Sequence, residues 1–158
     1  RSFHVTGVQT CALPISCEDG AGALRCMTNT LRNAGLNADQ VDYVNAHGTS
    51  TPLGDVAETV AVKRAFGEHA KKLAVSSTKS MHGHLLGGAG ALEMAVTLLP
   101  LLEGVIPPTA HLEDIDPGCT VRHVPGVAQR GDIPRAVMSN SFAFGGSNVV
   151  LIAEPPAA

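Results

Sequence analysis

The chain has 158 residues, of which 44% are hydrophobic, and its formal net charge is -3. This length and composition suffice for the core of one globular domain and exclude a disordered or fibrous protein. The densest basic cluster fits the solvated end of a helix rather than a basic stripe, and it comprises Lys63, Arg64, Lys71 and Lys72. We therefore expect no nucleic-acid partner.

Residues 1–16 differ in character from the rest of the chain. The segment from Val5 to Ile15 resembles the translation of a sequencing-adapter oligonucleotide, and it lacks the charged start and long apolar run of a secretory signal. We therefore expect residues 1–16 to be an artefact outside the fold and residues 17–158 to form one domain. The sequence becomes helical abruptly at Asp19 and has no initiating methionine. We expect an amino-terminal part of the protein to be missing.

The cysteines and the apolar segments indicate a cytoplasmic setting. Four cysteines stand in irregular contexts: Cys11, Cys17, Cys26 and Cys119. They form no CxxC pair and no disulfide ladder, which favours a reducing compartment. The most apolar segment, residues 85–106, is interrupted by glycine, proline and glutamate, so it predicts a buried helix and no membrane span.

Helices and strands are predicted to alternate along the first half of the chain. Apolar residues at helical spacing over residues 24–34 predict a helix that ends at Gly35, and residues 41–44 predict a strand. A second helix begins at Thr51 as the cap and Pro52 in the first turn, and it ends at Gly67. Its predicted apolar face consists of Leu53, Val56, Ala57, Val60, Ala61 and Ala65.

The second half repeats the alternation. Residues 73–75 predict a strand, and a third helix is expected to begin near His84, with Lys79 in the loop before it. Pro100 should end or kink that helix, because it cannot donate a backbone hydrogen bond. A turn-rich connection then leads to two closing strands, residues 135–139 and 148–153. Together these elements predict a three-layer α/β arrangement.

Two turns that carry histidines follow the two inner strands. His47 lies in the stretch from Val44 to Thr51, and His84 lies in the stretch from Ser77 to Gly90. Ligands collect at the carboxyl ends of strands in α/β sheets, so the two turns are expected to converge on one pocket. The glycine-rich part of the second turn lacks the spacing of a nucleotide-binding loop, and no nucleotide cofactor is expected.

Three motifs resemble the C-terminal half of the β-ketoacyl-acyl-carrier-protein synthases, the condensing enzymes of fatty acid synthesis. They are NAHGTST at residues 45–51, STKSM-x-GHLLG at 77–87 and NSF-x-FGG at 140–146. The resemblance implies a thiolase-like layered α-β-α fold, of which this chain would form the C-terminal half, and a homodimer. It also implies a reaction that joins an acyl chain held on a cysteine to malonyl-acyl-carrier protein with loss of carbon dioxide.

The resemblance also implies roles for individual residues. The catalytic residues would be His47, Lys79 and His84. Two neutral imidazoles would stabilise the negative charge that decarboxylation places on a thioester oxygen, and the ammonium group of Lys79 would help to keep His84 neutral. The substrate-binding residues would be Thr49 and Thr51, which hold phosphopantetheine, and Phe142 and Phe144, the latter as a gate over the acyl pocket. Phosphopantetheine arrives on the acyl carrier protein, so no covalently bound cofactor is expected.

Glu93 falls inside an otherwise apolar helix, where burial would neutralise it unless a cation or hydrogen-bond donors compensate. The resemblance implies a structural Na⁺ or K⁺ held by Asn45, Glu93, Ser139 and Asn140. A plain hydrogen-bond network is the alternative. His82 is a departure from the family pattern, which has threonine at this position.

None of the four cysteines has the strand-to-helix context of the family's nucleophile, so the chain alone is expected to be inactive. The leading hypothesis is a piece of a condensing acyltransferase. The alternative is a non-catalytic partner similar to a chain-length factor, which pairs with an active synthase. Retention of His47, Lys79 and His84 argues against the alternative.

Overall fold

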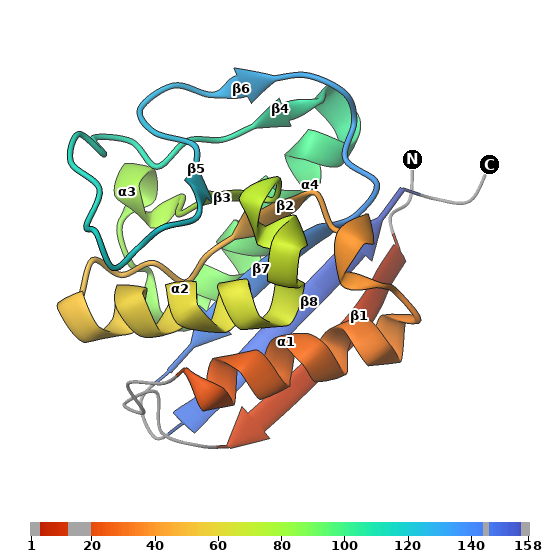
Figure 1. The fold of residues 1–158 in the computed structure, drawn as a ribbon. Coiled ribbons are helices and arrows are strands. Elements are labelled where there is room, and N and C mark those ends of the chain that lie inside the picture. The colour runs from red at the N-terminus through yellow and green to blue at the C-terminus, as the bar shows by residue number, and fades with distance from the viewer. Residues whose placement is uncertain (1–3, 13–19, 144–145, 156–158) are drawn as a thin grey trace.

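The computed structural model describes residues 4–12, as backbone, and residues 20–143 and 146–155. A six-stranded sheet lies between two layers of helices, in the order β1-β8-β7-β2-β3-β5 (Figure 1). Its strands are β1 (His4–Ala12), β2 (Tyr43–Asn45), β3 (Ala74–Ser76), β5 (Arg122–His123), β7 (Val137–Phe142) and β8 (Ser147–Glu154). A separate pair contains β4 (Val105–Ile106) and β6 (Gln129–Arg130). The predicted three-layer α/β arrangement is confirmed.

The centre of the sheet is parallel. Strand β2 runs parallel to both β3 and β7, and β3 runs parallel to β5, whereas β8 is antiparallel to β7. The carboxyl ends of β2 and β3 therefore lie at the same edge of the sheet, with Asn45 opposite Ser76. This register brings together the two histidine-bearing turns.

Strand β1 comes from the segment that we expect to stand outside the fold, residues 1–16. Its backbone pairs antiparallel with β8, from His4 opposite Glu154 to Ala12 opposite Ser147. Without β1, strand β8 would be an edge strand, and the main-chain groups of an edge can pair with many extended sequences. The adapter-like origin of residues 1–16 stays a prediction.

Helices α1 (Ala21–Ala34) and α2 (Pro52–Phe66) cover one face of the sheet, and 3-10 turns follow them at η1 (Ala38–Gln40) and η2 (Gly67–Lys71). Gly35 ends α1 in the left-handed conformation with φ 69°, as predicted. The predicted apolar face of α2 is confirmed only in part: Ala57 and Ala61 are buried, but the buried residues also include Glu58, Thr59, Val62 and Phe66. Leu53 is 68% exposed. Two neighbouring rows of side chains on this helix repeat with helical spacing. The row that contains the bulky Val62 and Phe66 packs against the sheet.

The third helical region differs from the expectation in three ways. Lys79 begins a short helix, α3 (Lys79–His82), instead of lying in a loop, and the long helix α4 (Ala89–Glu103) begins after the turn η3 (Leu86–Gly88) rather than near His84. Pro100 lies inside α4 and does not end it. Gly104 ends the helix with φ 61°, and its amide donates to the Pro100 carbonyl. A proline this close to the carboxyl end removes only one helical hydrogen bond.

Helix α4 covers the opposite face of the sheet with an unusual polarity. It buries Glu93 and Thr97 toward the sheet, together with the smaller or apolar Ala89, Pro100 and Leu101. Some bulky residues face outward, since Leu99 is 48% exposed and Leu86, in the preceding turn, is 77% exposed, whereas Met94 and Leu98 pack against the core.

Residues 86–103 are, by length and composition alone, apolar enough to cross a membrane, with a mean hydropathy of 1.3. The core helix of a soluble protein passes the same test. Glu93 on this helix forms an ion pair with Lys79, and Thr97 hydrogen-bonds Asn45. These are the contacts of a core helix, and the expected absence of a membrane span stays a prediction.

Candidate active site

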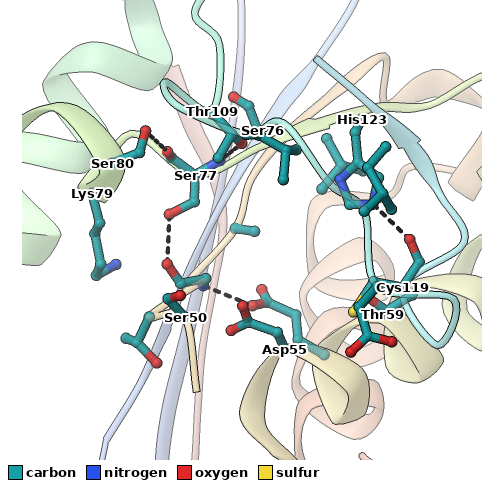
Figure 2. A pocket seen from close by; sticks show the side chains of 18 of the residues that line it. Ser50, Asp55, Thr59, Ser76, Ser77, Lys79, Ser80, Thr109, Cys119 and His123 are labelled. Atoms are coloured by element: carbon teal, nitrogen blue, oxygen red, sulfur yellow. Dashed lines mark hydrogen bonds between the residues drawn. The ribbon is translucent and has the colours of Figure 1, made fainter. Parts of the chain in front are cut away.

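The turns that follow β2 and β3 are fastened to each other. The Ser77 hydroxyl donates to the carbonyl of Gly48 over 2.8 Å (Figure 2). A Cβ atom on residue 48 would lie 2.6 Å from the Ser77 Cβ, so only glycine permits this approach. The two histidine turns are thus held at a fixed separation.

His47 and His84 lie beside each other, as the sequence predicted for the two turns. Their ring centroids are 5.6 Å apart in an edge-to-face arrangement with an interplanar angle of 86°. Phe142, at the end of β7, places its buried ring 5.7 Å from that of His47. Phe144, the expected gate, lies outside the described residues.

The surroundings of the His47 ring favour its neutral form. Burial, followed by the charges of Lys79 and His84, lowers the pKa of His47 to about 4. The main-chain amide of Leu86 donates to Nδ1 of His84 over 3.2 Å, so the neutral His84 ring carries its proton on Nε2. Leu86 has a left-handed φ of 50°, a strained conformation that sets the direction of its amide.

Lys79 and Glu93 form an ion pair that is almost fully buried, with side chains 5% and 1% exposed. The ammonium group supplies the compensation that a buried Glu93 requires. No further partner of Lys79 Nζ is present among the described residues. The Nζ atom is itself buried, although other atoms of Lys79 line the pocket.

Glu58 is a site residue that the sequence reasoning missed. Its buried carboxylate, on α2, accepts hydrogen bonds from the amides of His47 and Gly48 at 2.9 Å each and from Asn140 Nδ2 at 3.0 Å. Burial raises the pKa of this carboxyl, and the three donors oppose that shift. The sequence signal for Glu58 is its position one helical turn before Val62. An acid in that row must be buried when the row packs against the sheet.

A pocket of about 750 Å³ opens beside the His47 turn, between α2 and the segment that follows Thr109 (Figure 2). Thr49 and Thr51 both line it, with their hydroxyls 3.3 Å apart. Thr51 occupies the predicted N-cap position of α2, but its side chain forms no cap. Asp55 accepts from the amides of Ser50, Thr51 and Thr49 instead, so the threonine hydroxyls remain free to meet a ligand.

Asn45 joins the end of β2 to helix α4. Its Nδ2 donates to Thr97 Oγ1 over 3.0 Å and to Thr78 Oγ1 over 3.1 Å, and lies 3.4 Å from the carbonyl oxygen of Glu93. Its Oδ1 accepts from the amide of Thr78 over 3.3 Å. Hydrogen bonds inside the protein therefore use both ends of the Asn45 amide.

The side chains expected to hold a monovalent cation do not gather around one point. The Glu93 carboxylate faces the Lys79 ammonium, which already supplies a positive charge. Ser139 lies opposite Asn45 in the sheet, whereas Asn140 turns its amide to Glu58 and to the sulfur of Met27, in the α1 and α2 layer. These side chains do not fit a bound Na⁺ or K⁺, and we derive no chemical step from one.

The cysteine side chains that the structure describes do not match an activated nucleophile. Cys26 is buried on α1, where its thiol donates to the carbonyl of Asn148. Cys119 lies in the turn that borders the pocket, and burial raises the pKa of its thiol. A nucleophilic cysteine requires the opposite shift.

Sequence and structure comparisons agree with this geometry. The sequence model described as "Beta-ketoacyl synthase, C-terminal domain" matches residues 6–113. The chain belongs to this family. The resemblance carried by the three motifs is confirmed, and with it the thiolase-like α/β fold in the part that the chain spans.

The similar proteins are much longer than this chain. The 3-oxoacyl-[acyl-carrier-protein] synthase 2 of Coxiella burnetii is 52% identical over 134 residues, which are 85% of this chain and 32% of that protein. A beta-ketoacyl synthase from Burkholderia phymatum STM815 superimposes with a TM-score of 0.88 at 38% identity, over 97% of this chain and 37% of that one. A ketosynthase solved with its type II PKS acyl-carrier protein has a TM-score of 0.89 at 28% identity, over 97% and 38%. The chain therefore spans about a third of the length of the curated relatives it matches.

Proposed function

We propose that this chain is the C-terminal part of a 3-oxoacyl-acyl-carrier-protein synthase that elongates fatty acids. In the complete enzyme, His47, Lys79 and His84 would serve the decarboxylation of malonyl-acyl-carrier protein. The observation that carries the proposal is the meeting of two neutral imidazoles, 5.6 Å apart, beside a buried lysine.

The proposed step follows from the chemistry of a malonyl thioester. The bond between the α-carbon and the carboxylate breaks, carbon dioxide leaves, and the electron pair moves onto the thioester oxygen. The Nε2–H of His84 and the ring of His47 would hydrogen-bond that oxygen, because preorganised donors stabilise developing charge in a water-poor site. The charge of Lys79 disfavours protonation of His47 and adds to the positive potential.

The carbon nucleophile formed in this way would complete the condensation. It attacks the carbonyl carbon of an acyl thioester on a cysteine, a new carbon–carbon bond forms, and the cysteine thiolate leaves. The nucleophilic cysteine belongs to the part of the enzyme that this chain does not span, so the chain alone is expected to be inactive. Thr49 and Thr51 would hydrogen-bond the phosphopantetheine arm, and Phe142 and Phe144 would border the acyl chain.

The proposal also covers the binding partners, oligomeric state and cellular location of the complete enzyme. The carrier-protein complex of a similar ketosynthase supports an acyl carrier protein as partner. We also propose a homodimeric, cytoplasmic enzyme that binds neither nucleic acid nor membranes. Sedimentation of the complete protein should give twice the mass of one chain, and a monomer would refute that part.

The first test substitutes the two histidines in the complete synthase. His47→Ala and His84→Ala should each reduce release of labelled carbon dioxide from malonyl-acyl-carrier protein by at least about 100-fold. Acyl transfer to the cysteine should be retained in part. Lys71→Ala, on an exposed turn, serves as the control and should leave both reactions unchanged.

Release of carbon dioxide at the wild-type rate from either histidine variant would contradict the proposed roles. A complete protein whose preceding sequence lacks the nucleophilic cysteine, and which pairs with an active synthase, would favour the chain-length-factor alternative.

A further inference from the structure

His82 contributes two hydrogen bonds that the proposed reaction does not use. It lies on α3, three residues after Lys79, and is half-buried. Its Nδ1 is 2.7 Å from the carbonyl oxygen of Gly83, and its Nε2 is 3.2 Å from Oγ1 of Thr78. The ring therefore bridges the two ends of this short helix.

The partners of the ring determine which nitrogen carries the proton. A carbonyl oxygen can only accept, so Nδ1 of His82 must be the N–H donor to Gly83. In the neutral ring Nε2 then has only a lone pair, and the Thr78 hydroxyl must donate to it. The oxygen of that hydroxyl remains free to accept from Asn45 Nδ2, which lies 3.1 Å away.

The chain of hydrogen bonds continues to the partner of Lys79. The Asn45 amide also donates to Thr97, whose hydroxyl donates to the carbonyl of Glu93 over 2.6 Å. The Asn45 amide thus donates on both sides, and the bonds run from Asn45 to the Gly83 carbonyl in one direction and to helix α4 in the other. Oδ1 of Asn45, 3.3 Å from the Thr78 hydroxyl, competes with His82 for its proton. Thr78 immediately precedes Lys79, and Glu93 holds the Lys79 ammonium.

We infer that His82 is a positioning residue which, as the Nδ1–H tautomer, holds Thr78 against Asn45 and thereby fixes Lys79 opposite Glu93. The inference rests on the proposed function only for its effect on the reaction rate. Its hydrogen-bond pattern can be tested whether or not the protein decarboxylates malonyl thioesters.

The tautomer is measured first, by NMR of the complete protein with ¹⁵N-labelled histidine at pH 8, where an ordinary imidazole is neutral. The His82 signals are assigned by their loss in His82→Gln. Nε2 is the nitrogen that correlates with both ring carbon-bound protons, and we expect it to have the downfield chemical shift of a lone-pair nitrogen, which places the proton on Nδ1. A proton on Nε2 would overturn the inference.

The second test separates the two hydrogen bonds of the ring. The amide oxygen of glutamine in His82→Gln can accept from Thr78, whereas the shorter amide in His82→Asn can only replace the bond to Gly83. We expect the kcat of malonyl decarboxylation to fall roughly 2- to 10-fold in His82→Asn, the loss of about one hydrogen bond. It should stay within about twofold in His82→Gln, with KM unchanged in both.

Met81→Leu, an exposed neighbour on the same helix, is the matched control and should behave as wild type. Equal losses in His82→Gln and His82→Asn, or no loss in either, would overturn the inference, because neither pattern follows from the bond to Thr78. A wild-type protein that does not decarboxylate malonyl thioesters would refute the proposed function instead. The tautomer measurement would still decide the positioning of Thr78.

Discussion

The two faces of the central sheet differ in the size of their apolar cluster and in the charges that they bury. Helices α1 and α2 press apolar side chains such as Met27, Leu31 and Phe66 onto the sheet. Helix α4 instead turns Glu93 and Thr97 toward the sheet and leaves Leu99 outside. Burial of apolar area stabilises both faces, since Leu101 on α4 is buried with Tyr43 and Val137, and the second face adds an ion pair and a hydrogen-bond network.

This difference explains where the proposed chemistry lies. The buried acid of the α2 layer, Glu58, is negative, whereas on the other face Glu93 and Thr97 of α4 hold the positive Lys79 and the amide of Asn45 at the carboxyl end of the sheet. On the outer side of α4, Leu99 is 48% exposed. We expect the remaining two-thirds of a full-length synthase to cover it, since large exposed apolar surfaces mark contact sites.

The largest effect should come from breaking the ion pair on the polar face. Glu93→Ala in the complete protein leaves a buried, unpaired Lys79, which should lower the free energy of unfolding by about 3–5 kcal/mol. Replacing both charges, in Lys79→Met with Glu93→Leu, should restore most of that stability while abolishing decarboxylation. Urea unfolding and carbon dioxide release measure the two quantities. Equal destabilisation in the single and double variants would show that the ion pair is not the source of the cost.

The next prediction compares the apolar side chains of the two layers. Met27→Ala should lower the free energy of unfolding by about 2–5 kcal/mol, since Met27 is fully buried. Leu99→Ala should cost a similar amount in the complete protein if the outer side of α4 is covered there. Val127→Ala, at a residue 77% exposed, is the control and should change stability by less than about 0.5 kcal/mol. A Leu99→Ala cost as small as that of the control would show that α4 remains exposed.

The contrast between the faces also limits what the sequence could predict. The strands that end before His47 and before Lys79 were predicted correctly, because short apolar runs followed by turn residues are local signals. The register that joins the two turns depends on parallel pairing, which no local pattern specifies. The face of α2 was predicted only in part, because Leu53 is apolar yet 68% exposed.

Two polar residues of the candidate site show the same limit of prediction from sequence. Glu93 stood out in an apolar helix, but its partner Lys79 is distant in sequence and could not be chosen from spacing. Glu58 was overlooked because an acid on an amphipathic helix normally faces solvent. Its three hydrogen-bond donors come from a loop and from β7, so only the folded chain shows that it supports His47.

The smallest predicted effect tests the residue on which both layers converge. Glu58, in the α2 layer, holds the amide of His47, while the charge of Lys79, on the α4 side, helps to lower the pKa of its ring to about 4. The unfolded chain has the ordinary value of 6.5, so it binds more protons than the folded chain between these two values. The contribution of His47 to stability is therefore complete above pH 6.5 and is lost as the pH falls toward 4.

Urea unfolding of the complete protein at several pH values between 4 and 7 measures this contribution. The free energy of unfolding should fall less steeply with decreasing pH in His47→Gln, by a slope that corresponds to less than one bound proton. His111→Gln, an exposed histidine on the far wall of the pocket, is the matched control and should leave the slope unchanged. The Lys79→Met with Glu93→Leu protein sharpens the comparison, since removal of the ammonium should raise the folded pKa of His47 and narrow the window from its lower end. An unchanged slope in His47→Gln would mean that His47 titrates alike in the folded and unfolded chain. The two layers would then not act together on its ring.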